Sequence, residues 1–355
     1  MKDLILAVNP GAGSTKLGLF RAGARVAEHS VRHDERELER FGRIADQLPF
    51  RAEAVRSFLA RGGVERGALA AVVGRGGLFK PLASGTYLVN DAMLRDAREA
   101  PRGEHASNLG APIARAIADE HDCPAFIVDP VSVDELEPVA RLSGLAGVER
   151  KSLSHALNMK AVARRHAAAS MRRLESMRLI VAHLGTGTSL SAQRDGRLVD
   201  VVNPQDEGPF SGDRCGAVPN TALIDLCFAP GADKRAIRKR LFGDGGLFSY
   251  LGTRDVREAC ERAERGDAQA ALVLDAMAYQ VSKAVGELAT VLEGKVDAVL
   301  LTGGAAHREA LVDAIRRRVQ WIAPVFVYPG EDELLALAEG AQRVAAGEER
   351  AKTYE

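Results

Sequence analysis

The sequence has little that would place the protein in a membrane or in an oxidising compartment. No apolar stretch approaches the roughly 18 residues that a membrane span needs. The N-terminus also lacks the order of basic, apolar and small residues that marks a signal peptide. The four cysteines lie far apart and form no C-x-x-C pair; they are Cys123, Cys215, Cys227 and Cys260. We therefore expect reduced thiols in a cytoplasmic protein that is neither secreted nor anchored to a membrane.

The chain also lacks an excess of either charge. Its 48 basic and 48 acidic side chains cancel, so no overall field favours nucleic acid or an anionic membrane as a partner. A local basic pocket for a phosphorylated small molecule is compatible with this balance. At 355 residues the chain is long for one core and suits two domains of roughly 100 to 200 residues, with a cleft between them.

The two commonest nucleotide-binding motifs are missing as well. Residues 11–16, GAGSTK, lack the spacing of G-x-x-x-x-G-K-[ST], and no G-x-G-x-x-G opens a helix after a strand. These absences argue against P-loop and Rossmann proteins. A different arrangement for nucleotides, built on glycine turns between strands, stays open.

Two short glycine turns share the pattern G-x-G-[ST]. One begins at Gly11 and joins the apolar run 3–8 to a second strand-like run. The other begins at Gly185, inside the strand-turn-strand segment 179–202. The turns lie about 174 residues apart, and a period of that length predicts a duplicated domain.

Such turns suit phosphate binding, because glycine lets backbone N–H groups come close to phosphate oxygens. Hydroxyl groups can add donors, and the candidate phosphate-binding residues of the two turns are Gly11, Gly13, Ser14, Thr15, Gly185, Gly187 and Thr188. One G-x-G turn alone is more readily explained as a plain hairpin. Two matching turns, with Gly303 and Gly304 after a third strand-like run, favour a nucleotide held between two domains.

Strand-like and helix-like segments alternate along the chain, which predicts α/β layers. Further strands are expected at 69–74, 124–128, 296–302 and 324–328. Helices are expected near 51–61, 91–99, 109–121, 221–228, 233–241, 254–265, 267–293, 306–318 and 331–346. We place the boundary between domains 1–150 and 151–332, where loop composition passes into a new helix without a Ser- or Gly-rich linker.

Polar residues near strand ends are candidates for the chemistry. Arg75 follows an apolar strand between glycines, where its guanidinium could bind a carboxylate or a phosphoryl group; a solvated loop arginine is the plainer alternative. Asp129 ends the strand at 124–128, at the edge where open α/β sheets bind ligands. His105, in GEHASN, either lies near the site or caps the following helix.

The second half of the chain offers further candidates. His183 interrupts an apolar strand end directly before the second turn, so a site role is favoured over a buried core histidine. Arg214 lies in the acidic loop DEGPFSGDRCG, where a surface ion pair would contribute little, and we favour an anion-binding role. The acids Glu331, Asp332 and Glu333 begin the last helix, which suits either the helix dipole or a magnesium ion.

These motifs together resemble one known family, the acetate and butyrate kinases, in the superfamily of actin, hexokinase and the seventy-kilodalton heat-shock ATPases. The resemblance runs essentially end to end and is closest to the butyrate kinases. It rests on long runs such as VVGRGGLFKPLASGTYLVNDAML, FIVDPVSVDELEPVARLSG, EGPFSGDRCGAVP, GGLFSYLGTRD and LTGGAAHRE. It implies two duplicated actin-like domains of ribonuclease-H type with ATP in the cleft between them, and a C-terminal segment, about 333–355, packed back on the first domain.

The resemblance also implies roles for single residues. Asn9 and the first turn would contact the transferred phosphoryl group, and His183 with the second turn would bind the phosphates of ATP. Arg75 and Arg214 would hold the carboxylate and the migrating phosphoryl group, with His105 nearby.

The remaining implied roles concern the metal and the nucleoside. Asp129 would orient the substrate or magnesium, and Glu331 would be the second magnesium-side carboxylate, with Glu333 as the competing choice. Gly303 and Gly304 would border the adenosine. The turns NPGAGST and LGTGTS depart slightly from the family pattern, which would alter hydroxyl placement more than backbone shape.

The implied reaction joins ATP and a short-chain carboxylate, with butyrate as the first candidate, to give ADP and an acyl phosphate by direct, reversible in-line transfer. ATP/ADP and Mg²⁺ would be the cofactors, and a homodimer or larger homo-oligomer is expected. Acetate, propionate and isobutyrate kinases on the same fold are the alternatives within the family. A non-catalytic actin-like ATP-binding protein would explain the turns but not the arginines.

Overall fold

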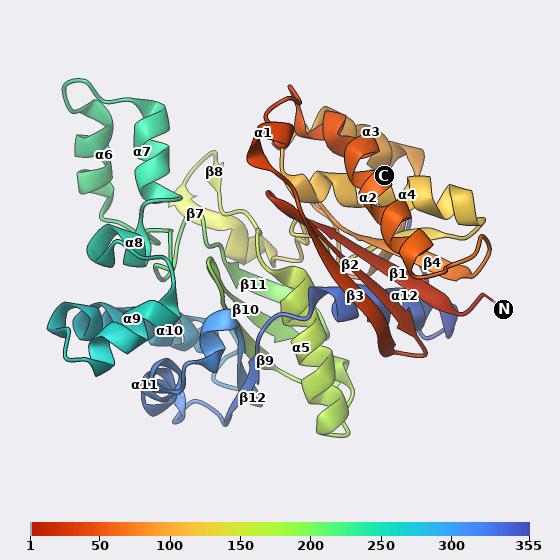
Figure 1. Ribbon diagram of the computed structural model, residues 1–355. Helices are drawn as coiled ribbons and strands as arrows, with labels where there is room; N and C mark the ends of the chain where they lie inside the picture. Colours follow the sequence, from red (N-terminus) through yellow and green to blue (C-terminus); the bar gives the residue numbers. More distant parts are fainter. Residues whose placement is uncertain (1) are drawn as a thin grey trace. The chain divides into compact units, whose positions relative to one another are not determined.

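The chain forms two compact units, as Figure 1 shows for the computed structural model, which describes residues 2–355. Unit 1 consists of residues 2–134 together with 332–355, and unit 2 consists of Glu135–Glu331. Each unit is built on one main β-sheet with helices packed against it. This architecture confirms the predicted α/β class.

Unit 1 has a six-stranded sheet with the strand order β3-β2-β1-β4-β6-β5. Its strands are β1 (Leu4–Pro10), β2 (Ser14–Arg21), β3 (Ala24–Arg32), β4 (Leu69–Arg75), β5 (Thr86–Leu88) and β6 (Ala125–Val128). Its helices are α1 (Glu35–Leu38), α2 (Leu48–Arg61), α3 (Asp91–Glu99), α4 (Gly110–His121) and α12 (Glu333–Ala345), with the 3-10 turns η1 (Ile44–Gln47) and η2 (Ala106–Leu109).

Helices cover both faces of the unit 1 sheet. Strand β1 is antiparallel to β2 and parallel to β4, and its Val8 faces a core shared with α2 and α4. Ile127 belongs to the same core, so Val128, one residue further along β6, points to the opposite face. There it meets α12, where a β-carbon at Gly340 would lie only 2.4 Å from Cγ2 of Val128. The blue α12 accordingly lies beside the red strands in Figure 1.

Unit 2 has a five-stranded sheet with the strand order β11-β10-β9-β12-β13. Its strands are β9 (Leu179–Leu184), β10 (Thr188–Arg194), β11 (Arg197–Val202), β12 (Ala298–Gly303) and β13 (Val325–Pro329), with a separate hairpin of β7 (Leu142–Leu145) and β8 (Val148–Glu149). Its helices are α5 (Ala156–Ala169), α6 (Asn220–Phe228), α7 (Lys234–Leu241), α8 (Gly246–Leu251), α9 (Val256–Glu264), α10 (Ala268–Val291) and α11 (Glu309–Val319), with the 3-10 turns η3 (Pro138–Arg141), η4 (Leu174–Ser176) and η5 (Gly304–His307). None of the helices within residues 2–355 is both long and apolar enough to cross a membrane.

The two main sheets repeat one arrangement. Strand β9 is antiparallel to β10 and parallel to β12, as β1 is to β2 and β4. Helices α10 and α11 share one core with this sheet, and α5 shares another. In each unit a glycine turn therefore links the central strand to its antiparallel neighbour, which confirms the predicted duplication.

The structure also contains elements that the sequence analysis did not predict. Strand β3 is an edge strand of mostly exposed polar residues, and the hairpin β7–β8 is exposed throughout, so neither carries a buried alternating pattern. The units separate at Asp134, earlier than the expected boundary near residue 150. The reason is that the next residues bond to β11: Leu198 N donates to Oε2 of Glu135 at 2.8 Å, and Glu137 N donates to the Val199 carbonyl at 3.0 Å.

Candidate functional site

The second glycine turn, in unit 2, is packed between two of the predicted site residues. Gly185 N donates to the Gly187 carbonyl at 3.2 Å, which closes the turn between β9 and β10. A β-carbon at Gly185 would lie 2.7 Å from Nε2 of His183, and one at Gly187 would lie 2.6 Å from Nη1 of Arg214. Both contacts are too short for a β-carbon, so a side chain at either position would displace the His183 ring or the Arg214 guanidinium. The structure thus brings His183 and Arg214 against the backbone of this turn.

His183 has a buried ring that makes no side-chain hydrogen bond with the described residues. Its side chain is 1% exposed and stacks on His155, with ring centroids 3.9 Å apart and an interplanar angle of 12°. Nε2 lies 3.2 Å from Oε1 of Glu331, but outside the hydrogen-bonding direction. Neither ring nitrogen makes a hydrogen bond with any of residues 2–355. The ring therefore keeps an unused donor and an unused acceptor directly behind the turn.

Arg214 is held by its loop in a partly exposed position. Ser211 N donates to the Arg214 carbonyl at 3.0 Å, and Nε of Arg214 lies 3.8 Å from Oδ1 of Asp213. Its side chain is 28% exposed. Burial raises the pKa of Asp213, and the cations of Arg214 and Arg254 oppose that rise. Burial also raises the pKa of the neighbouring Cys215 thiol, which keeps it protonated and unreactive.

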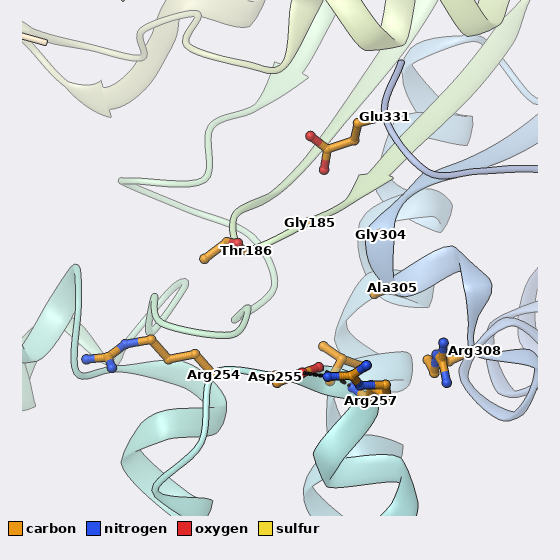
Figure 2. A pocket seen from close by; sticks show the side chains of 10 residues that line it. Gly185, Thr186, Arg254, Asp255, Arg257, Gly304, Ala305, Arg308 and Glu331 are labelled. Atoms are coloured by element: carbon orange, nitrogen blue, oxygen red, sulfur yellow. Dashed lines mark hydrogen bonds and ion pairs between the residues drawn. The ribbon is translucent and has the colours of Figure 1, made fainter. Parts of the chain in front are cut away.

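A cavity of about 470 Å³ opens beside this turn within unit 2. Its lining consists of Gly185, Thr186, Arg254, Asp255, Val256, Arg257, Gly304, Ala305, Arg308 and Glu331. Figure 2 shows the turn and Glu331 on one side of the cavity and a row of basic side chains on the other. A cavity of this volume is in the usual range for small-molecule sites.

The three arginines of the cavity differ in how far they are already engaged. Arg254 donates to Asp244 at 2.9 Å and lies over the ring of Phe248, and Arg257 pairs with Asp255 at 3.1 Å (Figure 2). The side chain of Arg308, in contrast, makes no hydrogen bond or ion pair with any of the described residues. Its charge is the one most available to an anionic ligand.

The paired glycines after β12 have different functions in the fold. Gly303 has a φ of 92°, and a β-carbon there would lie 2.5 Å from the Leu184 carbonyl oxygen, so this position requires glycine for packing. A β-carbon at Gly304 would meet no atom within 4 Å, because this residue faces the cavity. Of the two, only Gly304 borders open space.

The first glycine turn, in unit 1, is closed in a similar way. Gly11 N donates to the Ser14 carbonyl at 2.8 Å. Thr15 was expected to offer its hydroxyl to a phosphate, but its side chain is fully buried and its Oγ1 lies 2.8 Å from Nε2 of His33 and 3.1 Å from Nη1 of Arg51. The hydroxyl of Thr15 therefore belongs to an internal network behind the turn.

Three predicted residues of unit 1 come together at the start of α12. Glu333, the first residue of that helix, accepts a hydrogen bond from Nδ2 of Asn9 and forms an ion pair with Arg75. Arg75 and Glu333 are 21% and 13% exposed. Arg75 therefore already pairs with a carboxylate of the protein itself, that of Glu333. The alternative that Arg75 is a solvated loop arginine is wrong.

His105 and Asp129 are engaged in local structure. Nδ1 of His105 accepts a hydrogen bond from Ser107 N at 3.2 Å, so this side chain caps η2. A cap on the following helix was one of the two predicted alternatives. Asp129 is 1% exposed, and its Oδ1 accepts from Gly85 N at 2.6 Å. Its φ of 38° is in the left-handed region, which is strained for a residue other than glycine.

The three acids 331–333 serve different units. Glu331 belongs to unit 2, beside His183 and the cavity, whereas Asp332 caps α12 and Glu333 pairs with Arg75 in unit 1. No cluster of three or more metal-ligating side chains occurs among residues 2–355. Magnesium often takes only one or two protein carboxylates and completes its shell with phosphate oxygens and water. Glu331 fits such a site.

Four residues near the two turns were not singled out from the sequence. His155 stacks on His183, Arg51 lies behind the first turn, and Arg254 and Arg308 line the cavity. Three of them lie inside runs that carried the family resemblance, namely SLSHALN, LGTRD and GGAAHRE. Arg51 lies in FRAEA, a helical segment that shows no motif.

Comparison with known proteins agrees with this geometry. Residues 145–322, just over half of the chain, match the acetokinase family. A crystal structure of acetate kinase from Porphyromonas gingivalis superposes with a TM-score of 0.78 at 18% identity, over 96% of this chain and 99% of that chain. A propionate kinase from Francisella tularensis subsp. tularensis SCHU S4 gives 0.77 at 19% identity, over the same shares of the two chains. A ROK hexokinase from Thermus thermophilus gives 0.50 at 18% identity, over 98% of this chain and 100% of that chain.

At such identities these likenesses show the fold, which is the two-domain α/β fold of these kinases. The family match rests on sequence and covers unit 2 from the hairpin β7–β8 to the end of α11. It includes the second glycine turn, Arg214 and most of the cavity lining. The chain belongs to the acetokinase family.

Proposed function

We propose that the protein is an ATP-dependent kinase of short-chain carboxylates, which forms an acyl phosphate and ADP, and that butyrate is its preferred acid. The observation that carries this proposal is the second glycine turn. There His183 and Arg214 lie against glycines whose open backbone borders a basic cavity. Membership of the acetokinase family supports the reaction class, and the runs shared with the butyrate kinases support the choice of acid.

In this proposal the cavity of unit 2 binds the nucleotide. The phosphates would lie at the turn 185–187, where backbone N–H groups, the ring of His183 and the guanidinium of Arg214 offer donors. The adenosine would lie toward Gly304, where no atom obstructs it. Arg308, whose side chain has no partner among the described residues, would neutralise part of the charge.

The acid needs no general base, because a carboxylate is already ionised near neutral pH. The site residues therefore need only align the two substrates and neutralise the charge that spreads over the transferred phosphoryl oxygens. Arg214 would do this from unit 2. Arg75 and Asn9 would act from unit 1, where Glu333 holds both side chains in place. His105 would contribute by capping η2, and Asp129 by accepting the hydrogen bond from Gly85 N.

Magnesium, when bound, would offset the charge of the phosphate oxygens. Glu331 is the residue that we propose to hold it, because this carboxylate lines the cavity beside the turn. Asp129, the other carboxylate expected near the ion, is buried and accepts a hydrogen bond from Gly85, so it is less well supported.

A hydroxamate assay with acetate, propionate, butyrate, isobutyrate and isovalerate tests the proposal. We expect acyl phosphate from several acids, with the highest kcat/KM for butyrate. A different ranking would identify the protein as an acetate, propionate or branched-chain acid kinase. No acyl phosphate from any acid, with ATP still bound, would favour a non-catalytic nucleotide-binding protein and overturn the proposal.

Self-association goes with this proposal. Among the apolar helices, α10 around Ala276–Val291 is largely a core face, with Val285 fully buried. The exposed apolar side chains of α6 are better placed, since Ile224 is 56% and Phe228 is 85% exposed. We expect the wild-type protein to elute as a dimer in light-scattering chromatography and Phe228→Glu to shift it toward the monomer; an unchanged mass in both would contradict this surface.

A cytoplasmic location, where ATP is available, completes the proposal.

A further inference from the structure

Arg51, on α2, is a buried cation that is surrounded by the first glycine turn. Its side chain is 1% exposed, and burial lowers its pKa. Its hydrogen bonds go to the Gly11 carbonyl at 2.9 Å, the Ser14 carbonyl at 3.0 Å, the Ala12 carbonyl at 3.0 Å, Thr15 Oγ1 at 3.1 Å and Gln47 Oε1 at 3.0 Å. None of these partners is a carboxylate. A buried charge without an opposite charge is costly, so this arrangement calls for an explanation beyond packing.

The position of the guanidinium determines where the amides of the turn point. In a trans peptide the C=O of one residue and the N–H of the next point in opposite directions. The chain contains no cis peptide among its described residues. Since Arg51 holds the carbonyls of Gly11 and Ala12, the N–H groups of Ala12 and Gly13 must point away from it.

These two N–H groups are available to a ligand. Neither Ala12 N nor Gly13 N donates a hydrogen bond to any of residues 2–355, and both residues are exposed. A β-carbon at Gly13 would meet no atom within 4 Å, so the outer side of the turn is open. Two successive N–H groups that face one open side form a concave site for an anion.

The buried charge also strengthens these donors. A hydrogen bond from a cation to a carbonyl polarises the peptide unit, which makes the N–H at its other end a better donor. The positive charge, which lacks a carboxylate partner, further favours an anion at the outer side of the turn. Burial and the charge of Arg51 both lower the pKa of His33, so the neighbouring ring stays neutral and does not add a second cation.

We propose that Arg51 is a positioning residue that holds the Ala12 and Gly13 amides outward as donors to phosphoryl oxygens. Arg51 does not itself touch the ligand; it acts through the two peptide units. The inference rests on the proposed function in one respect, which is that the anion is the phosphoryl group of the reaction. The binding of a phosphate oxyanion at this turn can nevertheless be tested without turnover.

The first test is a titration with inorganic phosphate, followed by amide NMR of protein labelled with ¹⁵N-glycine and ¹⁵N-alanine. The Gly13 signal is assigned by its loss in Gly13→Ala. We expect phosphate to shift the Gly13 and Ala12 amides in the wild type, and the affinity of this site to fall by at least about tenfold in Arg51→Gln, the size expected when aligned donors are lost. Arg56→Gln is the matched control, because Arg56 lies on the same helix but pairs with Glu120 at the surface.

Arg51→Lys keeps a charge near the turn but cannot hold both carbonyls with one planar fork. It should also weaken phosphate binding, and it serves if Arg51→Gln does not fold. If phosphate shifts neither amide in the wild type, or shifts them with equal affinity in folded Arg51 variants, the proposal is wrong.

The second test separates positioning from a structural role by kinetics. In folded Arg51→Gln we expect kcat to fall by about 100-fold while KM for ATP changes by less than about threefold, because the proposed nucleotide cavity lies in unit 2. A variant that loses stability but keeps its kcat would show a structural role only. If the wild type phosphorylates no acid, the proposed function fails, but the phosphate titration still decides the role of Arg51.

Discussion

The two glycine turns have the same place in their sheets, and each has an arginine against it, but the two arginines are used in opposite ways. Arg51 lies behind the first turn, buried, and binds its carbonyl oxygens. Arg214 lies against the α-carbon of Gly187, partly exposed, and binds none of that turn's carbonyls. The two turns thus share their place in the sheet, but the arginine charge lies behind the first turn and beside the second. We infer that the first turn works through its backbone alone and the second through backbone and side chain together.

The largest effect is expected at Arg214. Arg214→Ala should lower kcat by about 100- to 1,000-fold, since a cation that meets developing charge is lost. The free energy of unfolding should change by less than about 1 kcal/mol, because the ion pair with Asp213 is long and partly exposed. Initial-rate kinetics and urea denaturation of the same preparation measure both quantities.

Arg262→Ala is the matched control for that variant. Arg262 lies on α9 of the same unit, with a side chain that is also 28% exposed, and it pairs with Asp267 at 2.7 Å. Its kcat should stay within about twofold of the wild type. Equal losses of kcat in Arg214→Ala and Arg262→Ala would contradict the inference that the second turn works through the side chain of Arg214.

A smaller effect is expected from adding one methyl group to the second turn. In Gly187→Ala the new β-carbon would lie 2.6 Å from Nη1 of Arg214, so the guanidinium must move, and we expect kcat to fall by about 10- to 100-fold, as for a displacement of about 1 Å. Gly286→Ala is the control, because a β-carbon at this position of α10 would meet no atom within 4 Å, and its kcat should stay within about twofold of the wild type. Equal kcat values for Gly187→Ala and Gly286→Ala would contradict the role of Arg214 at the second turn.

The smallest effect is a pH dependence of stability at the first turn. The pKa of His33 is lowered in the folded protein, first by burial and then by Arg51, so the unfolded chain takes up the proton first as the pH falls. The stabilisation from the neutral ring is therefore present above about pH 6.5 and is lost as the pH falls through the lower, folded pKa, by at most about 1.4 kcal/mol per pH unit.

His33→Gln should flatten this part of the stability curve in urea denaturation between pH 7.5 and pH 5. His307→Gln, at an exposed position of unit 2, is the control and should follow the wild-type curve. If both variants keep the full acid sensitivity of the wild type, His33 does not contribute to it.

Much of this architecture could be predicted from the sequence, because it depends on local patterns. The apolar runs gave the central strands, the glycine turns were found where expected, and α3 spans the predicted residues 91–99. His183 directly precedes the second turn in the sequence, and the structure brings its side chain against that turn; the contact of Arg214 with the same turn was not predicted.

The remaining features depend on contacts between distant parts of the chain. Arg51 meets a turn about 40 residues earlier, and no local pattern marks an arginine that will be buried by backbone carbonyls. The engagement of Asp129 with Gly85, and of Glu333 with Asn9 and Arg75, likewise arises only when the chain folds. Edge strand β3 lacked the buried alternation on which strand prediction relies.

Helix α12 has a consequence for the order in which the protein folds during its synthesis. This helix covers one face of the unit 1 sheet, with Gly340 fitted against Val128, yet it follows all of unit 2 in the chain. Unit 2 is continuous in sequence, so it can form its core without α12, whereas unit 1 can be completed only once this last helix has been made. The N-terminal strands, although made first, must wait with an uncovered apolar face and finish last, which makes them the part of the nascent chain most in need of a chaperone.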